Sequence, residues 1–153
     1  MYQAIVDKLD LFSEEMQFHY VAPNTTLIAE VLRLDADRLS ALMPFEVSKY
    51  VFVLGQYLVL LQHNENIAII HHRLAQKTFE YTLNKFKLES KDIIGKTAKE
   101  RDAWVLINVD AVRKLHDELL ELEAKKLLMD GMVRAVEGLL NALKKEMSGR
   151  YTD

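Results

Sequence analysis

A heptad pattern of apolar residues near the end of the chain is the feature that most restricts how it can fold. From residue 112 to residue 147, eleven positions follow one another in steps of three and four, and ten of them are apolar. This spacing keeps one stripe on one side of a helix. At about 1.5 Å per residue such a helix is ~54 Å long, more than a small domain can bury within itself. The ten apolar positions are Val112, Leu115, Leu119, Leu122, Met129, Val133, Val136, Leu140, Leu143 and Met147, and Lys126 is the eleventh.

The composition of the whole chain also favours long helices. Half of the 153 residues are apolar, and there are five glycines and two prolines. Both prolines, Pro23 and Pro44, come early, so that later helices can run without interruption. Pro44 suits the first turn of a helix that we expect to extend to about Phe86.

The absence of cysteine excludes disulfides, thiolate metal sites and a cysteine nucleophile. It fits a reducing compartment, and we expect a cytoplasmic location. The first residues carry acidic groups where a signal peptide would be basic and then apolar. The longest uncharged stretch, residues 50–64, is shorter than the ~20 residues that cross a bilayer. We therefore expect a soluble protein.

Shorter helices are predicted around these long ones. One amphipathic helix precedes Pro23, and Asn24 is placed to cap a second, which carries apolar residues up to Leu42. Thr97 and Glu100 have the spacing of a capping box, which predicts a short helix over residues 98–107, and Gly149 is the expected end of the last helix. Residues 50–62 are apolar on all sides and need to be covered all round. The first amphipathic helix carries Ile5, Leu9, Phe12 and Met16, and the second carries Leu27, Ile28, Val31, Leu32, Leu39 and Leu42.

These elements predict an all-α fold: a long antiparallel helical hairpin, similar to a coiled coil, formed by residues 44–153. Two short helices in residues 1–43 pack on the hairpin, within one structural domain. Leu120, Leu127, Met132 and Leu139 flank the stripe, and exposed apolar flanks usually mark partner surfaces. We therefore expect these four residues to form an oligomer or partner interface. Lys126 either fixes the register of the seam or occupies a loosely packed layer.

The candidate motifs for catalysis are incomplete. Gly95-Lys96-Thr97 resembles the end of a phosphate-binding loop, but Ser90 stands where that loop needs its first glycine. His71 and His72 point about 100° apart on a helix, and Glu65 with His72 supplies two ligands where zinc needs more. We expect no enzyme activity, no metal and no cofactor.

The distribution of charge is more informative than its total. The net charge is −3, but residues 66–101 carry eight basic and four acidic side chains, whereas the segments on either side are acidic. The positive charge thus gathers near the tip of the expected hairpin, around residues 85–101. The eight candidate nucleic-acid-binding residues are Arg73, Lys77, Lys85, Lys87, Lys91, Lys96, Lys99 and Arg101.

Aromatic residues are interleaved with these cations. They are Phe79, Tyr81, Phe86 and Trp104. Cations that contact phosphates, alternating with rings on which bases stack, are typical of surfaces that bind single strands without sequence preference. The alternative is an ordinary charged loop over core aromatics, and we expect Phe79 and Phe86, seven residues apart, to be core. In an oligomer, several such surfaces would add through multivalency.

The order of these segments resembles a known family. The run YVFVLGQYLVLLQHNENIAIIHHRLAQKTFEY is followed by a charged break, then by GKTAKERDAW and by LHDELLELEAKKLLMDGMVRAVEGLLNALKKEM. This order, over about residues 50–147, is similar to that of UvsY-like phage recombination mediators. The resemblance implies an oligomeric protein without enzyme activity that binds single-stranded DNA and helps to exchange a single-strand binding protein for a RecA-type recombinase. Its DNA-binding stretch would correspond to Arg73 and Lys77, although KLESKDIIGK replaces the Gly/Arg-rich turn that follows in the family.

Two hypotheses result. In the first, the chain is a mediator-like accessory protein of phage recombination or replication, whose partners are single-stranded DNA, further copies of itself, and a recombinase or single-strand binding protein. It would then act in the cytoplasm of the host cell. In the second, it is a structural or adaptor coiled-coil protein that docks onto proteins during phage assembly or host interaction, and it does not bind nucleic acid.

Overall fold

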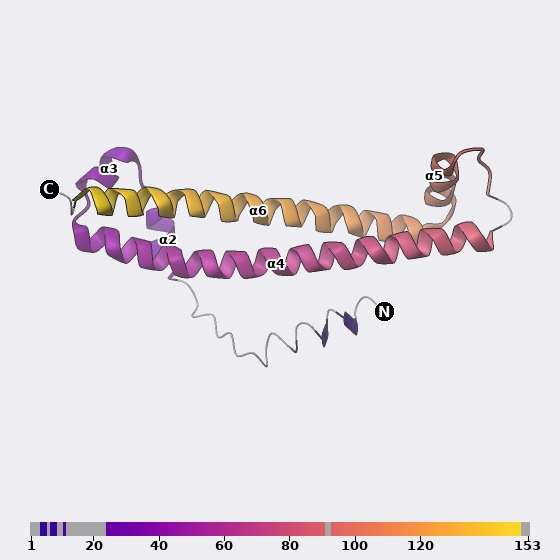
Figure 1. Ribbon diagram of the computed structural model, residues 1–153, viewed down its shortest axis with the longest axis horizontal. Coiled ribbons are helices and arrows are strands. Elements are labelled where there is room, and N and C mark those ends of the chain that lie inside the picture. The colour runs from indigo at the N-terminus through magenta and orange to yellow at the C-terminus, as the bar shows by residue number, and fades with distance from the viewer. Residues whose placement is uncertain (1–3, 6, 9–10, 12–23, 91–92, 151–153) are drawn as a thin grey trace. The chain divides into compact units, whose positions relative to one another are not determined.

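The computed structural model describes residues 4–5, 7–8, 11, 24–90 and 93–150. Within this part of the chain, all regular structure is helical, which confirms the all-α prediction (Figure 1). The amphipathic helix expected before Pro23 falls mostly outside the described residues. No helix in the described part is both long enough and apolar enough to cross a membrane. The helices are α2 (Thr25–Val31), α3 (Ala36–Ala41), α4 (Pro44–Glu89), α5 (Ala98–Asn108) and α6 (Asp110–Arg150).

Helix α4 begins at Pro44, as predicted, and runs for 46 residues to Glu89. Its start is fixed by the Glu46 carboxylate, which accepts a hydrogen bond from the Met43 backbone N–H at 2.7 Å. At 1.5 Å per residue the helix is about 69 Å long. No proline or cap interrupts it, and it ends three residues beyond the expected Phe86.

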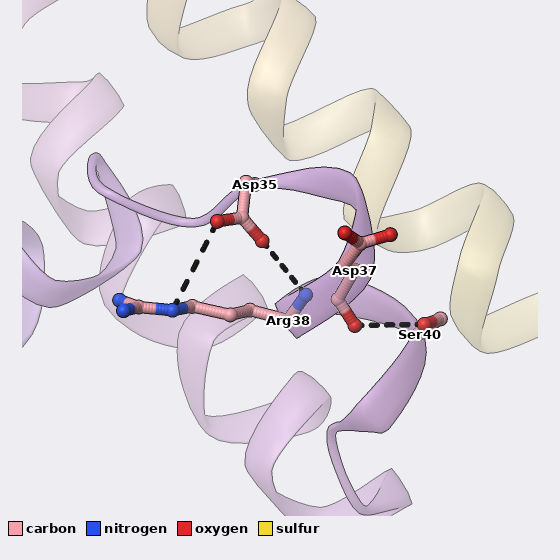
Figure 2. A network of polar contacts seen from close by, with 4 residues as sticks. All are labelled: Asp35, Asp37, Arg38 and Ser40. Atoms are coloured by element: carbon pink, nitrogen blue, oxygen red, sulfur yellow. Dashed lines mark hydrogen bonds and ion pairs between the residues drawn. The ribbon is translucent and has the colours of Figure 1, made fainter.

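The single helix expected after Asn24 is in fact two helices, which corrects the prediction. Asn24 does cap α2, since its side chain accepts from the Leu27 N–H. Asp35 then caps α3 in the same way, accepting from the Arg38 N–H at 2.8 Å, with the Arg38 guanidinium 3.9 Å from its carboxylate (Figure 2). A second N-cap inside the predicted helix stops the first helix and starts another.

The predicted capping box is present at the start of α5. The Thr97 hydroxyl accepts from the Glu100 N–H, and the Glu100 carboxylate accepts from the N–H groups of Thr97 and Lys96. Helix α5 ends at Asn108, one residue beyond the expected end at residue 107, and the chain leaves helical geometry at Val109 before α6 begins at Asp110. Gly149 does not end α6, which reaches Arg150. A glycine ends a helix by adopting a positive φ, and within the described chain the positive-φ glycine is Gly95.

The contacts divide the chain into two compact units, and both long helices run through each of them. Unit 1 contains Ile67–Leu127, and unit 2 contains the described parts of Gln17–Asn66 together with Leu128–Asp153. This division lies within α4 and α6, whereas the expected boundary at residues 43 and 44 coincides with the start of α4.

In unit 2, α4 and α6 pack together over a core that includes α2. The heptad residues Val133, Val136, Leu140 and Leu143 are buried there. Ser48 donates a hydrogen bond to the Met147 sulfur, and Gln62 donates one to Glu137 at 3.1 Å. In this unit, later residues of α4 therefore contact earlier residues of α6. The heptad stripe therefore packs within the chain in this unit. The buried core is formed by Val31, Val47, Leu54, Leu61, Val133, Val136, Leu140 and Leu143.

In unit 1, α4 and α6 pack together again, with α5 closing the core. Leu83, Val105 and Val112 are buried at its centre. Further along, Ala68 and Ala75 are the buried residues of α4, while Leu115, Leu119 and Leu122 of the heptad stripe are half-buried. Lys126 is also half-buried. All eleven heptad positions of α6 thus avoid full exposure, as the spacing predicts.

Candidate nucleic-acid interface

One exposed side of α4 in unit 1 carries three cations and one ring in regular order. Arg73, Lys77, Tyr81 and Lys85 follow one another at intervals of four residues, and all four are exposed. Residues four apart on a helix are neighbours on one face, about 6 Å apart along the axis. These residues therefore form a continuous row, here called the α4 ladder, about 18 Å long. Tyr81 is 69% exposed, although tyrosine is a large, partly apolar residue.

A shallow groove of about 370 Å³ lies beside the first half of the ladder. Arg73 and Lys77 are among the residues that line it, together with the apolar Ile70 and Leu74. Gln76 donates to the Glu80 carboxylate at 2.9 Å, so that this acid is engaged on its own helix. The groove is lined by Ile70, Arg73, Leu74, Gln76, Lys77 and Glu80.

The other aromatic residues of the region lie on the opposite side of α4 or on α5. Phe79 is two residues from Tyr81, a rotation of about 200° on a helix. Phe79 and Phe86 pack against the core of unit 1, as expected, and so does Trp104 from α5. The rings of Phe79 and His116 are 5.6 Å apart, which ties α4 to α6. Of the four candidate aromatics, Tyr81 is the one available to a ligand.

The eight candidate cations do not form one group. Lys87 points away from the ladder and forms an ion pair with Asp102 of α5, at 2.6 Å between Nζ and Oδ1. The buried Asp102 oxygen has no other partner, so this pair compensates its burial. Lys87 therefore holds α5 on α4, and it is not free to bind phosphate.

Three more cations lie in or beside the N-terminal part of α5. Lys96, Lys99 and Arg101 are exposed, and the Arg101 Nε donates to the Gly95 carbonyl at 3.3 Å. They belong to α5 and the loop before it, whereas the ladder belongs to α4. Lys91 lies outside the described residues.

The loop before α5 is shaped by local bonds, which explains the Gly-Lys-Thr sequence without a nucleotide. Gly95 has φ near +156°, and a Cβ there would lie 2.9 Å from the Arg101 backbone nitrogen, so the close approach requires glycine. Hydrogen bonds from the Thr97 and Lys96 N–H groups hold the pKa of the Glu100 carboxyl below its ordinary value of 4.5.

A second hollow, of about 510 Å³, lies in unit 2 between α2, α3 and α4. Its lining includes two arginines, Arg33 and Arg38, and two glutamates, Glu30 and Glu46, so that its formal charges balance and favour neither an anion nor a cation. Burial, followed by the nearby charges of Glu30 and Glu46, raises the pKa of the Tyr50 hydroxyl. Within the described residues, no three His, Cys, Asp or Glu side chains gather in a way that could hold a metal ion.

The four candidate interface residues on α6 fall into two kinds. Leu120 and Leu127 are 50% and 60% exposed, which leaves them available to a partner. Met132 and Leu139 instead pack against the core of unit 2 and contribute to its intramolecular packing.

Sequence reasoning missed a larger apolar surface in unit 2. Phe45 and Phe52 are 67% and 66% exposed, and Val59 is 54% exposed. They are spaced by seven residues, and this spacing was the signal that could have revealed one outward face in a segment that is apolar on all sides.

Comparison with known proteins assigns neither a family nor a function to this chain. No protein-family model matches the chain, and no curated protein or solved structure matches it. The chemistry of the site therefore comes from its own residues. The α4 ladder is a row of cations with one exposed ring, and such a row can contact a flexible polyanion.

Proposed function

We propose that this protein is a single-stranded-DNA-binding accessory protein of phage recombination or replication, of the mediator kind that UvsY represents, and that it is not an enzyme. The observation that carries the proposal is the α4 ladder of Arg73, Lys77, Tyr81 and Lys85. Its cations contact successive phosphates, while the Tyr81 ring stacks on a base. Both interactions are independent of sequence, since every nucleotide offers a phosphate and a π face.

The rest of the fold serves this surface as a scaffold. The two long helices form an antiparallel hairpin, and copies of the hairpin assemble so that several ladders act on one strand. Multivalency then makes a weak individual contact strong. Such an assembly acts in the host cytoplasm and meets a recombinase or a single-strand binding protein on the same DNA.

A second function is favoured by the exposed leucines of α6. Leu120 and Leu127 lie seven residues apart, and their exposed fractions are 50% and 60%. Isolated apolar residues are ordinary on protein surfaces, but a repeated pair on one helix face is typical of an adaptor that docks onto another helix. In that case the ladder is only a solvated face.

The test is fluorescence anisotropy with labelled oligo-dT. The wild-type protein is compared with a double variant, Arg73→Glu with Lys77→Glu. The proposal predicts that reversing the charge at these two positions of the α4 ladder abolishes measurable binding at moderate salt concentration, because two phosphate contacts become repulsive. Both residues are exposed, so circular dichroism should show unchanged helicity.

The matched control is Lys114→Glu with Lys125→Glu, which reverses two exposed charges of unit 1 on α6. This variant should bind like the wild type, apart from a small uniform loss. Equal losses in the control and the double variant would mean that binding follows net charge alone, and binding unaffected by the double variant would remove the ladder from the site.

A further inference from the structure

The hollow between α2, α3 and α4 has the size of a small-ligand site. Its volume is about 510 Å³, within the range that such sites occupy in proteins. All of its lining residues belong to unit 2. Its apolar lining includes Leu34 and Leu42, which also pack against the buried core of that unit. The core therefore holds this part of the lining in place.

The positive and negative side chains of this hollow do not neutralise one another directly. Within the described residues, neither of its arginines, Arg33 and Arg38, forms an ion pair with either of its two glutamates. Arg38 lies 3.9 Å from Asp35, but both side chains are well exposed, so this pair contributes little and leaves the guanidinium able to bind an anion (Figure 2). The hollow thus presents both charges to a ligand.

The negative groups of the hollow lie beside Tyr50. Burial, and then the charges of Glu30 and Glu46, raise the pKa of the Tyr50 hydroxyl, which also donates a hydrogen bond to Glu30. An arginine equally close would lower this pKa, so the nearest charges to the hydroxyl are acidic. Glu46 accepts from the Met43 N–H through one carboxylate oxygen, and its other oxygen can accept from a ligand.

We infer that this hollow binds a small zwitterion whose primary ammonium and anionic group are several bonds apart, as in a short peptide with free termini. The ammonium donates to the carboxylates of Glu30 and Glu46. The anionic group accepts from the guanidinium groups of Arg33 and Arg38. Such a ligand suits a hollow whose formal charges balance, because it brings one charge to each end and no net charge.

This inference does not rest on DNA binding, since the hollow belongs to unit 2 and the α4 ladder to unit 1. The ethanolamine headgroup of a phospholipid carries the same pair of charges as a short peptide. The experiment therefore includes a soluble form of that headgroup beside the peptide.

The test is saturation-transfer NMR of the full chain, without DNA, with alanyl-alanine as the probe. The wild type should bind it saturably, with a Kd on the order of 1 mM, as expected for so small a ligand at an open site. N-acetyl-alanyl-alanine carries only the negative charge, and alanyl-alanine amide only the positive one. Each should bind about tenfold more weakly, because one end of the hollow then lacks its partner.

Two variants assign each end of the ligand to one end of the hollow. Arg33→Gln and Glu30→Gln each remove one exposed charge at similar side-chain length, and each should weaken binding of alanyl-alanine about tenfold. Arg33→Gln should also discriminate less between alanyl-alanine and its amide. Glu30→Gln should discriminate less between alanyl-alanine and its acetylated form. A residue with only a structural role would change neither preference.

The matched controls are Lys49→Gln and Asp37→Asn, which remove exposed charges of unit 2 that do not line the hollow. Both should bind alanyl-alanine like the wild type. Circular dichroism should show all four variants to be as helical as the wild type.

Glycerophosphoethanolamine distinguishes the two sources of the zwitterion. Tighter binding of this compound than of the peptide would support the zwitterion site and make the headgroup its source. Absence of saturable binding of both compounds to the wild type would overturn the inference. So would equally tight binding of a blocked peptide, because the hollow would then need only one charge, and so would equal losses in the controls and the two variants.

Discussion

At the scale of single residues, helix geometry assigns opposite roles to similar side chains. Phe79 and Tyr81 are two positions apart on α4, and this places Phe79 against the core of unit 1 and Tyr81 in solvent. Lys85 and Lys87 differ in the same way, since Lys87 forms an ion pair with Asp102 whereas Lys85 is exposed to solvent. The candidate site is therefore narrower than a count of basic and aromatic residues indicates.

Tyr81 offers a test of base stacking at this scale. Tyr81→Ala should weaken binding to oligo-dT by about 1–3 kcal/mol, the usual contribution of one stacked base. Tyr81→Phe should bind like the wild type, because the ring remains and only the hydroxyl is lost. Anisotropy at constant salt measures both affinities. Equal weakening by the two variants would assign the effect to the hydroxyl, and no weakening by either would remove the ring from the site.

At the scale of elements, local signals in the sequence predicted what local bonds determine. The start of α4 at Pro44, the Asn24 cap and the Thr97–Glu100 box were all readable because each depends on residues within one turn. Asp35 is also an N-cap residue that the sequence shows, but the apolar spacing on either side of it predicted one continuous helix. The Lys87–Asp102 pair could not be predicted, since it forms only when α5 folds back on α4.

The capping box gives a prediction for α5. Thr97→Ala removes the acceptor for the Glu100 N–H and should destabilise the protein by about 1 kcal/mol, measured by chemical denaturation. The contribution of Glu100 should depend on pH. Its pKa in the folded state is depressed, so its stabilisation is present above the ordinary value of 4.5 and is lost as the pH falls through the lower folded value.

Glu100→Gln separates the two effects of the box, because the amide still accepts hydrogen bonds but does not titrate. Its stability should vary less with pH than that of the wild type in the acidic range. The same acid dependence in both proteins would contradict the assignment and would place the titrating group elsewhere.

At the scale of the whole molecule, the balance of charge requires that any binding to DNA be local. The chain is acidic overall, at −3, and its positive excess is confined to residues 66–101. A protein of this kind has no general attraction for a polyanion, so its affinity must come from a few phosphate contacts. Assembly of several copies would multiply those contacts without adding new ones to any single copy.

The dependence of oligo-dT affinity on salt concentration therefore tests whether the α4 ladder binds single-stranded DNA through phosphate contacts. For single strands, log K falls by about 0.7 per phosphate contact for each unit of log salt concentration. With an oligonucleotide short enough for one copy, the three cations of the α4 ladder predict a slope of about −2. Reversing Arg73 and Lys77 should flatten that slope toward zero. Absence of binding at low salt, or binding whose affinity does not change with salt, would show that the ladder does not bind DNA through phosphate contacts.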